Sequence, residues 1–98
     1  MNDIQVIVTF EARPESTTPL SALLSQVRQQ LPLVDGCKSV RVLIRRDAPQ
    51  VFTLVEDWQS TAQHQKHLAT VVASGAWDTI AALLAADPVS HTYGELPA

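Results

Sequence analysis

A short stretch near the middle of the chain gathers most of the side chains that could carry chemistry. Residues 52–58 end on Trp58, and two histidines, His64 and His67, follow closely. Imidazole titrates near neutral pH, so it can form hydrogen bonds or move a proton under ordinary conditions. If residues 52–58 form a strand, Glu56 lies on the same strand face as Trp58. We therefore place the functional site here, although these residue types alone do not name a reaction.

The residues that follow Trp58 are predicted to form a helix that carries both imidazoles. Ser60 with Gln63 three positions later is a capping-box signature for a helix start. On a helical wheel, His64 projects toward the inward side and His67 lies at its edge. The apolar residues expected to define this inward side are Leu68, Val71 and Val72.

We predict a small apolar cavity in each subunit, between the sheet and the helices. His64 and His67 would supply its polar groups, and Trp58 would be an apolar wall or an indole donor. The alternative is that Trp58 belongs to the core and that the histidines are ordinary packing residues. The predicted catalytic residues are His67, His64 and Trp58, and the predicted substrate-binding residues are Phe10, Leu54 and Val71.

The sequence predicts neither a metal site nor a nucleotide site. His64 and His67 are close enough on a helix to meet one metal ion, but zinc normally takes three or four ligands, and His91 lies on a distant segment. Cys37 is the only cysteine, which excludes an internal disulfide and a cysteine-based zinc site, and it is expected to be a buried structural thiol. The sequence contains no phosphate-binding glycine loop.

Composition limits the class of protein further. The chain has 98 residues, which fit one domain over 1–98, with 46% hydrophobic residues and a net charge of −3. Its seven basic residues form no long stripe, so no nucleic acid partner is expected. No apolar run approaches the roughly 18 residues that span a bilayer, and the start of the chain does not resemble a signal peptide. We expect a cytoplasmic protein with no membrane partner.

The hydrophobic periodicity predicts an α+β fold. Alternation indicates strands over residues 4–12, 39–45, 51–58 and 89–93, and helical spacing indicates helices over 19–31, 61–74 and 77–84. Hydroxyl side chains at 16–18 are expected to cap the first helix, and Gly75 is expected to separate the last two. This order fits a ferredoxin-like, four-stranded antiparallel sheet with its helices on one face.

The other face of this sheet also carries apolar residues, and leaving them wet is costly. The charged fraction of 17% is below the roughly 25% typical of globular domains, so the surface is poorly covered by charge. Pairing two sheets face to face would bury the apolar side chains and form a dimeric α+β barrel. We therefore expect a homodimer, in which the buried face includes Ile7, Leu43, Val51 and Val55.

Several short motifs together resemble one known family, the antibiotic biosynthesis monooxygenase (ABM) domain, over essentially the whole chain. They are Phe10-x-Ala12-x-Pro14-Glu15, Gly36-Cys37, Phe52-x-x-x-Glu56-x-Trp58, Ser60 and His67. The resemblance implies a dimeric α+β barrel. It also implies cofactor-independent oxygenation of aromatic polyketide quinols or, in a related branch, oxidative haem cleavage, whereas other members have no established activity.

The resemblance extends unevenly to the individual site residues. Trp58 matches the tryptophan of the polyketide oxygenases, and His67 matches the helical histidine of the wider family. Leu54 stands where these oxygenases have an asparagine, and His64 stands where they have a tyrosine. The haem-cleaving branch uses an asparagine on the first strand, which residues 6–10 lack, so this branch is disfavoured.

The function implied by the resemblance is monooxygenation of quinol-like or polyphenolic aromatic molecules without a metal or other cofactor. His67 or His64 would act as the base in this reaction. The alternative is a dimeric barrel, associated with stress, that binds a small hydrophobic ligand without chemistry.

Overall fold

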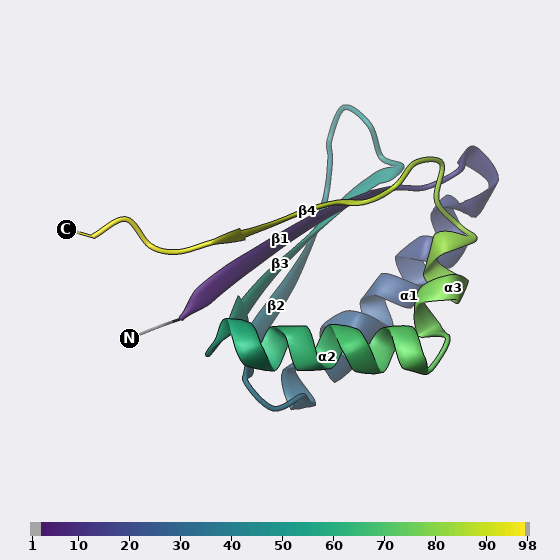
Figure 1. Ribbon diagram of the computed structural model, residues 1–98. Helices are drawn as coiled ribbons and strands as arrows, with labels where there is room; N and C mark the ends of the chain where they lie inside the picture. The colour runs from purple at the N-terminus through teal and green to yellow at the C-terminus, as the bar shows by residue number, and fades with distance from the viewer. Residues whose placement is uncertain (1–2, 98) are drawn as a thin grey trace.

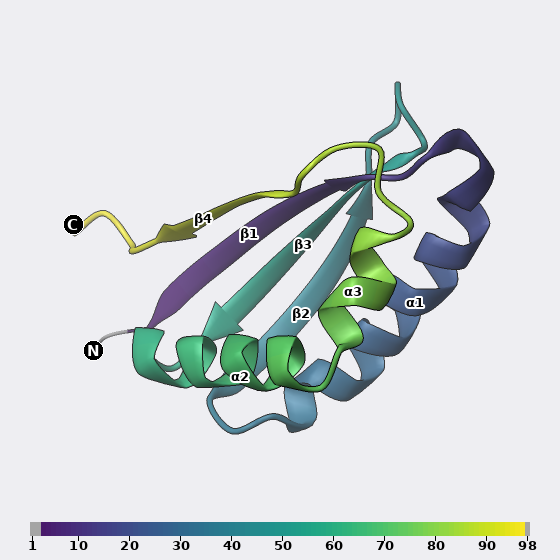
Figure 2. The same ribbon diagram turned by 45° about the vertical axis from the view of Figure 1, so that its right-hand side comes forward.

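The fold is built on a four-stranded antiparallel sheet in the order β2-β3-β1-β4, as described by a computed structural model over residues 3–97. Figures 1 and 2 show the helices on one face of this sheet and the other face open. The strands are β1 (Ile4–Glu11), β2 (Cys37–Ile44), β3 (Val51–Trp58) and β4 (Val89–Tyr93).

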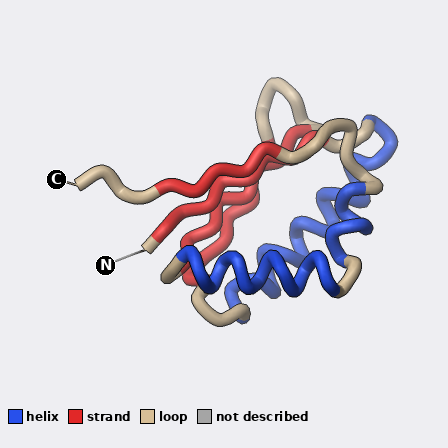
Figure 3. The backbone as a smooth tube through the Cα atoms, viewed as in Figure 1, coloured by secondary structure: helices blue, strands red, loops and turns tan. Residues whose placement is uncertain are grey.

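Three helices and two short 3-10 segments form the second layer (Figure 3). The helices are α1 (Thr17–Gln30), α2 (Thr61–Ala73) and α3 (Ala76–Ala81), and the 3-10 segments are Pro14–Ser16 and Leu31–Leu33. The predicted α+β, ferredoxin-like class and the predicted order of elements are therefore confirmed. The association of two sheets into a barrel remains a prediction.

The pairing of β1 with β3 places alternate side chains on the helix-covered face. Ile4 lies opposite Trp58, and Val6 lies opposite Glu56, in this antiparallel register. Because side chains alternate between the faces of a strand, the even-numbered residues of β1 and β3 meet the helices. These residues join one core cluster with α1 and the chain after α3: Val6, Phe10, Ala12, Leu20, Leu24, Leu31, Val40, Phe52, Leu54, Trp58 and Leu84.

The helix boundaries that differ most from the sequence prediction are the start of α1 and the end of α3. The helix α1 begins at Thr17, two residues before Pro19, and its N-cap residue, Ser16, makes no side-chain capping hydrogen bond. A 3-10 turn that starts at Pro14 leads the chain into the helix instead. Helix α3 ends at Ala81 because the following residues return to the sheet. Leu84 forms a bridge there with Ala12, which directly follows β1.

The inward side of α2 also differs from the predicted one. Leu68 and Val72 are 47% and 66% exposed, whereas His64 is buried. The side of α2 that faces the protein is formed by His64, His67 and Val71. The structure thus places His64 and Val71 on the predicted side of the helix and places Leu68 and Val72 on its exposed side. Polar contacts anchor the start of the helix.

These contacts join the start of α2 to the turn before β2. The amide of Gln59 donates to the carbonyl of Gly36 at 2.7 Å, and Nε2 of Gln63 donates to Oδ2 of Asp35 at 3.2 Å. Gly36 has φ +88°, and an added Cβ there would lie 2.5 Å from the side chain of Gln63. A larger residue at this position would therefore be strained and would also push on the helix start.

Among residues 3–97, no helix has the length and apolar character needed to cross a bilayer.

We expect Gly36→Ala to destabilise the protein more than Gly75→Ala does. Both glycines have positive φ, but only the Cβ at position 36 meets another group, since nothing lies within 4 Å of position 75. The positive φ alone should cost about 1 kcal/mol at either position. Urea unfolding followed by circular dichroism measures both free energies, and Gly94→Ala serves as a neutral reference because nothing lies within 4 Å of it. Equal losses at 36 and 75 would contradict the contact with Gln63.

Candidate functional site

Trp58 is the centre of the candidate site and is completely buried, with 0% of its surface exposed. The ring of His64 meets it edge to face, with ring centroids 5.2 Å apart and planes inclined by 61°. The ring of His67 lies against it at 5.5 Å with an inclination of 33°. The structure thus brings together the three residues that the sequence predicted as catalytic.

This cluster forms because β3 passes into α2 through a very short turn. Trp58 ends the strand, and the Ser60 hydroxyl accepts a hydrogen bond from the backbone N–H of Gln63 at 3.2 Å, which starts the helix as predicted. Residues three apart on a helix are neighbours on its surface. His64 and His67, in the first two turns of α2, therefore lie together against the indole.

Glu56 is a member of the cluster to which the sequence analysis assigned no role. It is only 6% exposed, and its Oε1 accepts a hydrogen bond from Nε1 of Trp58 at 2.8 Å. The two salt bridges found over residues 3–97 both lie elsewhere, Lys38 with Asp3 and Arg45 with Asp47. Burial raises the pKa of the Glu56 carboxyl, and the hydrogen bond from Trp58 opposes this rise.

The hydrogen bond to Glu56 bears on the donor role considered for Trp58, because the indole N–H is already used in this arrangement. Trp58 also belongs to the buried core cluster, as the alternative interpretation expected. The sequence did contain a signal for Glu56, since an acidic residue at an inward position between Leu54 and Trp58 is unusual for a buried strand face.

Both histidines in the cluster favour their neutral form. Burial lowers the pKa of His64, and the neighbouring His67 lowers it further. Burial also lowers the pKa of His67. A neutral imidazole has a free nitrogen lone pair, so either ring can accept a proton near pH 7.

A hollow of about 380 Å³ opens beside His67, between the three helices. We call it the interhelical hollow, and it is lined by Leu23, Gln26, Val27, Gln30, Leu31, Val34, His67, Val71, Ala76, Thr79 and Ile80. Its walls are mainly aliphatic, with two amides, one hydroxyl and one imidazole. Its volume lies within the roughly 300–1,000 Å³ of small-molecule sites.

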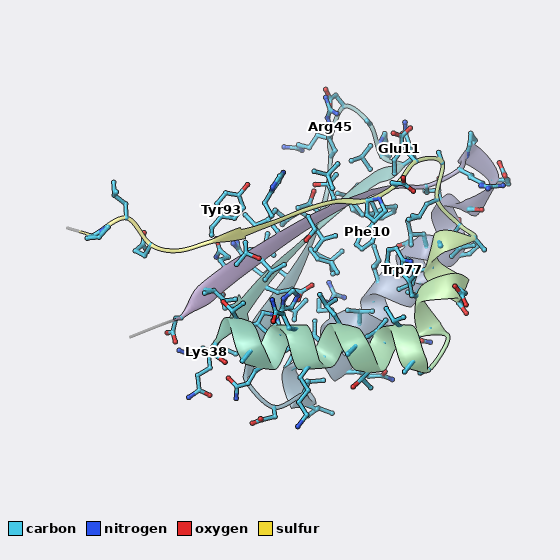
Figure 4. The ribbon with its side chains drawn as sticks, viewed as in Figure 1. Phe10, Glu11, Lys38, Arg45, Trp77 and Tyr93 are labelled. Carbon is cyan, nitrogen blue, oxygen red and sulfur yellow. The ribbon has the colours of Figure 1, made fainter. Side chains whose placement is uncertain are left out.

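The predicted cavity residues divide between this hollow and the core. His67 and Val71 line the interhelical hollow, whereas Phe10, Leu54 and Trp58 are packed in the core beneath the helices. Neither these three residues nor the buried His64 belong to its lining. In Figure 4, Phe10 and Trp77 lie between the sheet and α3. The open space is therefore displaced from the sheet into the helical layer, and sequence periodicity could not locate it because α1 and α3 supply most of its walls.

Cys37 has the properties of a structural thiol. It is half-buried at the start of β2, and burial together with the charge of Glu56 raises its pKa to about 11. It is therefore a weak nucleophile at neutral pH. Over residues 3–97, no three His, Cys, Asp or Glu side chains lie close enough together to hold a metal ion.

We expect the folded protein to lose stability on acidification through His64 and His67. Their folded pKa values are lower than in the unfolded chain, so the unfolded state binds more protons as the pH falls below about 6.5. The free energy of unfolding in urea should fall between pH 7.5 and pH 5.5, and the His64→Gln/His67→Gln double variant should lose much of this dependence. Because the pKa of Glu56 is raised in the folded state, its effect on the pH dependence of stability has the opposite sign. This effect is present in both the wild type and the double variant, so it cancels in their comparison. A Gln65→Ala variant, altered on the exposed side of α2, should retain the wild-type dependence. An unchanged pH dependence in the double variant would contradict the burial of the two imidazoles.

Comparisons with known proteins agree with this fold. Rv0793 from Mycobacterium tuberculosis is 22% identical with a TM-score of 0.86, over 99% of this chain and 98% of that chain. A conserved protein from Methanosarcina mazei is 17% identical with a TM-score of 0.84, over 95% and 92%. A candidate antibiotic biosynthesis monooxygenase from Deinococcus radiodurans is 25% identical with a TM-score of 0.85, over 97% and 94%.

No curated protein matches the sequence significantly. The family model described as "Antibiotic biosynthesis monooxygenase" matches residues 3–77, a span that includes β1, β2, β3, α2 and every member of the Trp58 cluster. The chain belongs to the antibiotic biosynthesis monooxygenase family.

Proposed function

We propose that the protein is a monooxygenase of quinol-like or polyphenolic aromatic molecules that uses no metal or flavin. One observation carries the proposal. Among the residues 3–97 that line the interhelical hollow, His67 alone is ionisable, and its ring also lies against the buried indole of Trp58. A base of lowered pKa therefore faces a small, largely apolar space.

The chemistry requires little more than this base. Removing the proton of a phenolic O–H leaves an electron-rich phenolate, whose ring carbon can reduce molecular oxygen. In the net reaction, either a ring CH2 becomes a carbonyl, or a quinol ring C–H becomes C–OH while the two phenolic C–OH groups become quinone carbonyls. In both cases one oxygen atom enters the substrate and the other leaves as water. The substrate supplies all of the electrons, so the protein needs only to deprotonate, desolvate and orient it.

The other lining residues fit a flat aromatic molecule with oxygen substituents. Leu23, Val27 and Ile80 offer aliphatic walls, and Gln26 and Gln30 offer amide groups at one side of the interhelical hollow. An amide can donate to a carbonyl oxygen or accept from a hydroxyl. Leu54 on β3 cannot supply an amide to the substrate, but Gln26 and Gln30 on α1 can.

The alternative is a binding protein that holds a small hydrophobic ligand in the same hollow. The observation that favours it is Leu54, which stands where the polyketide oxygenases have an asparagine. Binding without reaction would need the apolar walls but would not depend on the imidazole of His67.

We expect wild-type protein to accelerate oxygen uptake with some members of a panel of hydroquinones and anthrones. His67→Ala should lower kcat/KM by about 100-fold, the lower end of the usual range for a general base. Trp58→Phe should cause a smaller loss, because it retains an aromatic ring against His67 but gives up the hydrogen bond to Glu56.

Gln65→Ala is the matched control for the oxygen measurement, since Gln65 lies on the exposed side of α2 and does not line the interhelical hollow. Its activity should equal that of the wild type. If no panel member is consumed faster than in buffer, or if His67→Ala and Trp58→Phe both match the wild type, the binding function replaces the enzymatic one.

We also propose that the protein is a homodimer in which two copies meet through their open sheet faces. Arg41, Val55, Ile7 and His91 form one row across this face, and Leu43, Thr53, Thr9 and Val89 form the next.

Several polar groups of this face satisfy one another. The hydroxyls of Thr9 and Thr53 are 3.1 Å apart, and Asp57 accepts from Gln5 at 3.0 Å and from Ser39 at 2.6 Å. Burying groups that are already hydrogen-bonded costs less than burying free ones. The open face is therefore suited to close contact with a second sheet.

We expect the wild type to sediment as a dimer at micromolar concentration and the Leu43→Lys/Val89→Lys variant to sediment as a monomer. The two new charges would lie on the open face, where these apolar side chains are 46% and 56% exposed. The matched control is Leu68→Lys/Val72→Lys, which charges two comparably exposed apolar residues of α2 and should remain dimeric. A monomeric wild type, or dissociation in the α2 variant alone, would contradict the sheet-to-sheet contact.

A further inference from the structure

We propose that Glu56 is a positioning residue that acts through Trp58: its carboxyl holds the indole in the orientation that supports the rings of His64 and His67. The proposal deepens the proposed function, because it identifies what keeps the candidate base in place, and its catalytic meaning rests on that function. The claim that Glu56 orients the indole of Trp58 can be tested without any substrate.

The geometry makes Glu56 the polar contact that fixes the indole. Trp58 has one polar atom, Nε1, and this atom donates to Oε1 of Glu56 at 2.8 Å. Packing alone restrains a flat ring less precisely than packing together with a directed hydrogen bond. The edge-to-face contact with His64 and the tilted contact with His67 both depend on the plane in which this ring is held.

The cost of burying Glu56 indicates that packing does not explain its presence. Its cross-strand neighbours on the same face are apolar, Val6 on β1 and Val40 on β2. Burying a carboxyl in such surroundings without a cation is unfavourable, and a leucine would be easier to accommodate. The carboxyl provides what a leucine cannot, namely an acceptor for the indole N–H.

The ionisable groups packed around the Glu56–Trp58 pair are few. Cys37 lies opposite Trp58 on β2, and α2 presents His64 and His67. Asp57 belongs to the other face of β3, where it accepts from Gln5 and Ser39. A carboxyl group can accept from the indole in either protonation state, so the positioning does not require Glu56 to be charged.

The test replaces Glu56 by Leu, Gln or Asp and follows both histidines and the indole by NMR. Glu56→Leu removes the acceptor, and Glu56→Asp withdraws it by one methylene. In both variants we expect the Trp58 indole N–H to exchange with solvent about tenfold faster, the factor that corresponds to one lost hydrogen bond. We also expect the titrations of His64 and His67 to move upward, because looser packing admits water. Glu56→Gln keeps an acceptor oxygen and should restore wild-type behaviour.

Two further comparisons show whether the effect passes through Trp58. In a Trp58→Phe background there is no indole N–H to hold, so Glu56→Leu should cause no additional shift in either histidine. The Trp77 indole on α3 and the His91 ring on β4 provide reference signals in the same spectra, and neither should change.

Three results would overturn the proposal. They are an unchanged indole exchange rate in Glu56→Leu and Glu56→Asp, a failure of Glu56→Gln to restore it, and equal histidine shifts with and without Trp58. Should the wild type consume no quinol while the NMR effects appear, the positioning role stands and the enzymatic function falls. Should the wild type be active while the Glu56 variants keep its kcat, KM and spectra, the positioning role falls alone.

Discussion

The pairing of β1 with β3 is the constraint on which the rest of the molecule depends. These two central strands come from different halves of the chain, and their register sets which residues face the helices. With Ile4 opposite Trp58, the inward positions receive both the apolar core and the Glu56–Trp58 pair. A shift by one residue would turn all of these side chains to the open face. The register of the sheet therefore determines that Glu56 and Trp58 face the helices, and the local motif at the start of α2 acts within this limit.

Much of the fold was predictable because its signals are local. Alternation identified all four strands, and the capping box at Ser60 and Gln63 marked the start of α2. Gly75, at φ +81°, separates α2 from α3 as expected. Errors arose where distant contacts decide the outcome. The end of α3 depends on the bridge between Leu84 and Ala12, and the rotation of α2 depends on contacts with the turn at Gly36.

The candidate site was predictable in part for the same reason. Trp58, His64 and His67 are close in sequence, so one short turn is enough to bring them together. The interhelical hollow is different, since Gln26, Gln30 and Thr79 reach it from α1 and α3, far away along the chain. A sequence pattern states which side of a helix is apolar, but it does not state how closely three helices approach one another. The burial of Glu56 could be suspected from its position between Leu54 and Trp58, but the apolar neighbours that make this burial costly, Val6 and Val40, come from other strands.

The outer edges of the sheet have a consequence for how the protein avoids aggregation. An unpaired strand edge is a template on which another chain can add a strand. The edge strand β2 carries the charges of Lys38 and Arg41, and the opposite edge strand, β4, is confined to five residues between Pro88 and Gly94. Short or charged edges offer little to an incoming strand. Fibril-like growth along the hydrogen-bonding direction is therefore disfavoured, even though the sheet presents a broad, partly apolar surface at right angles to that direction.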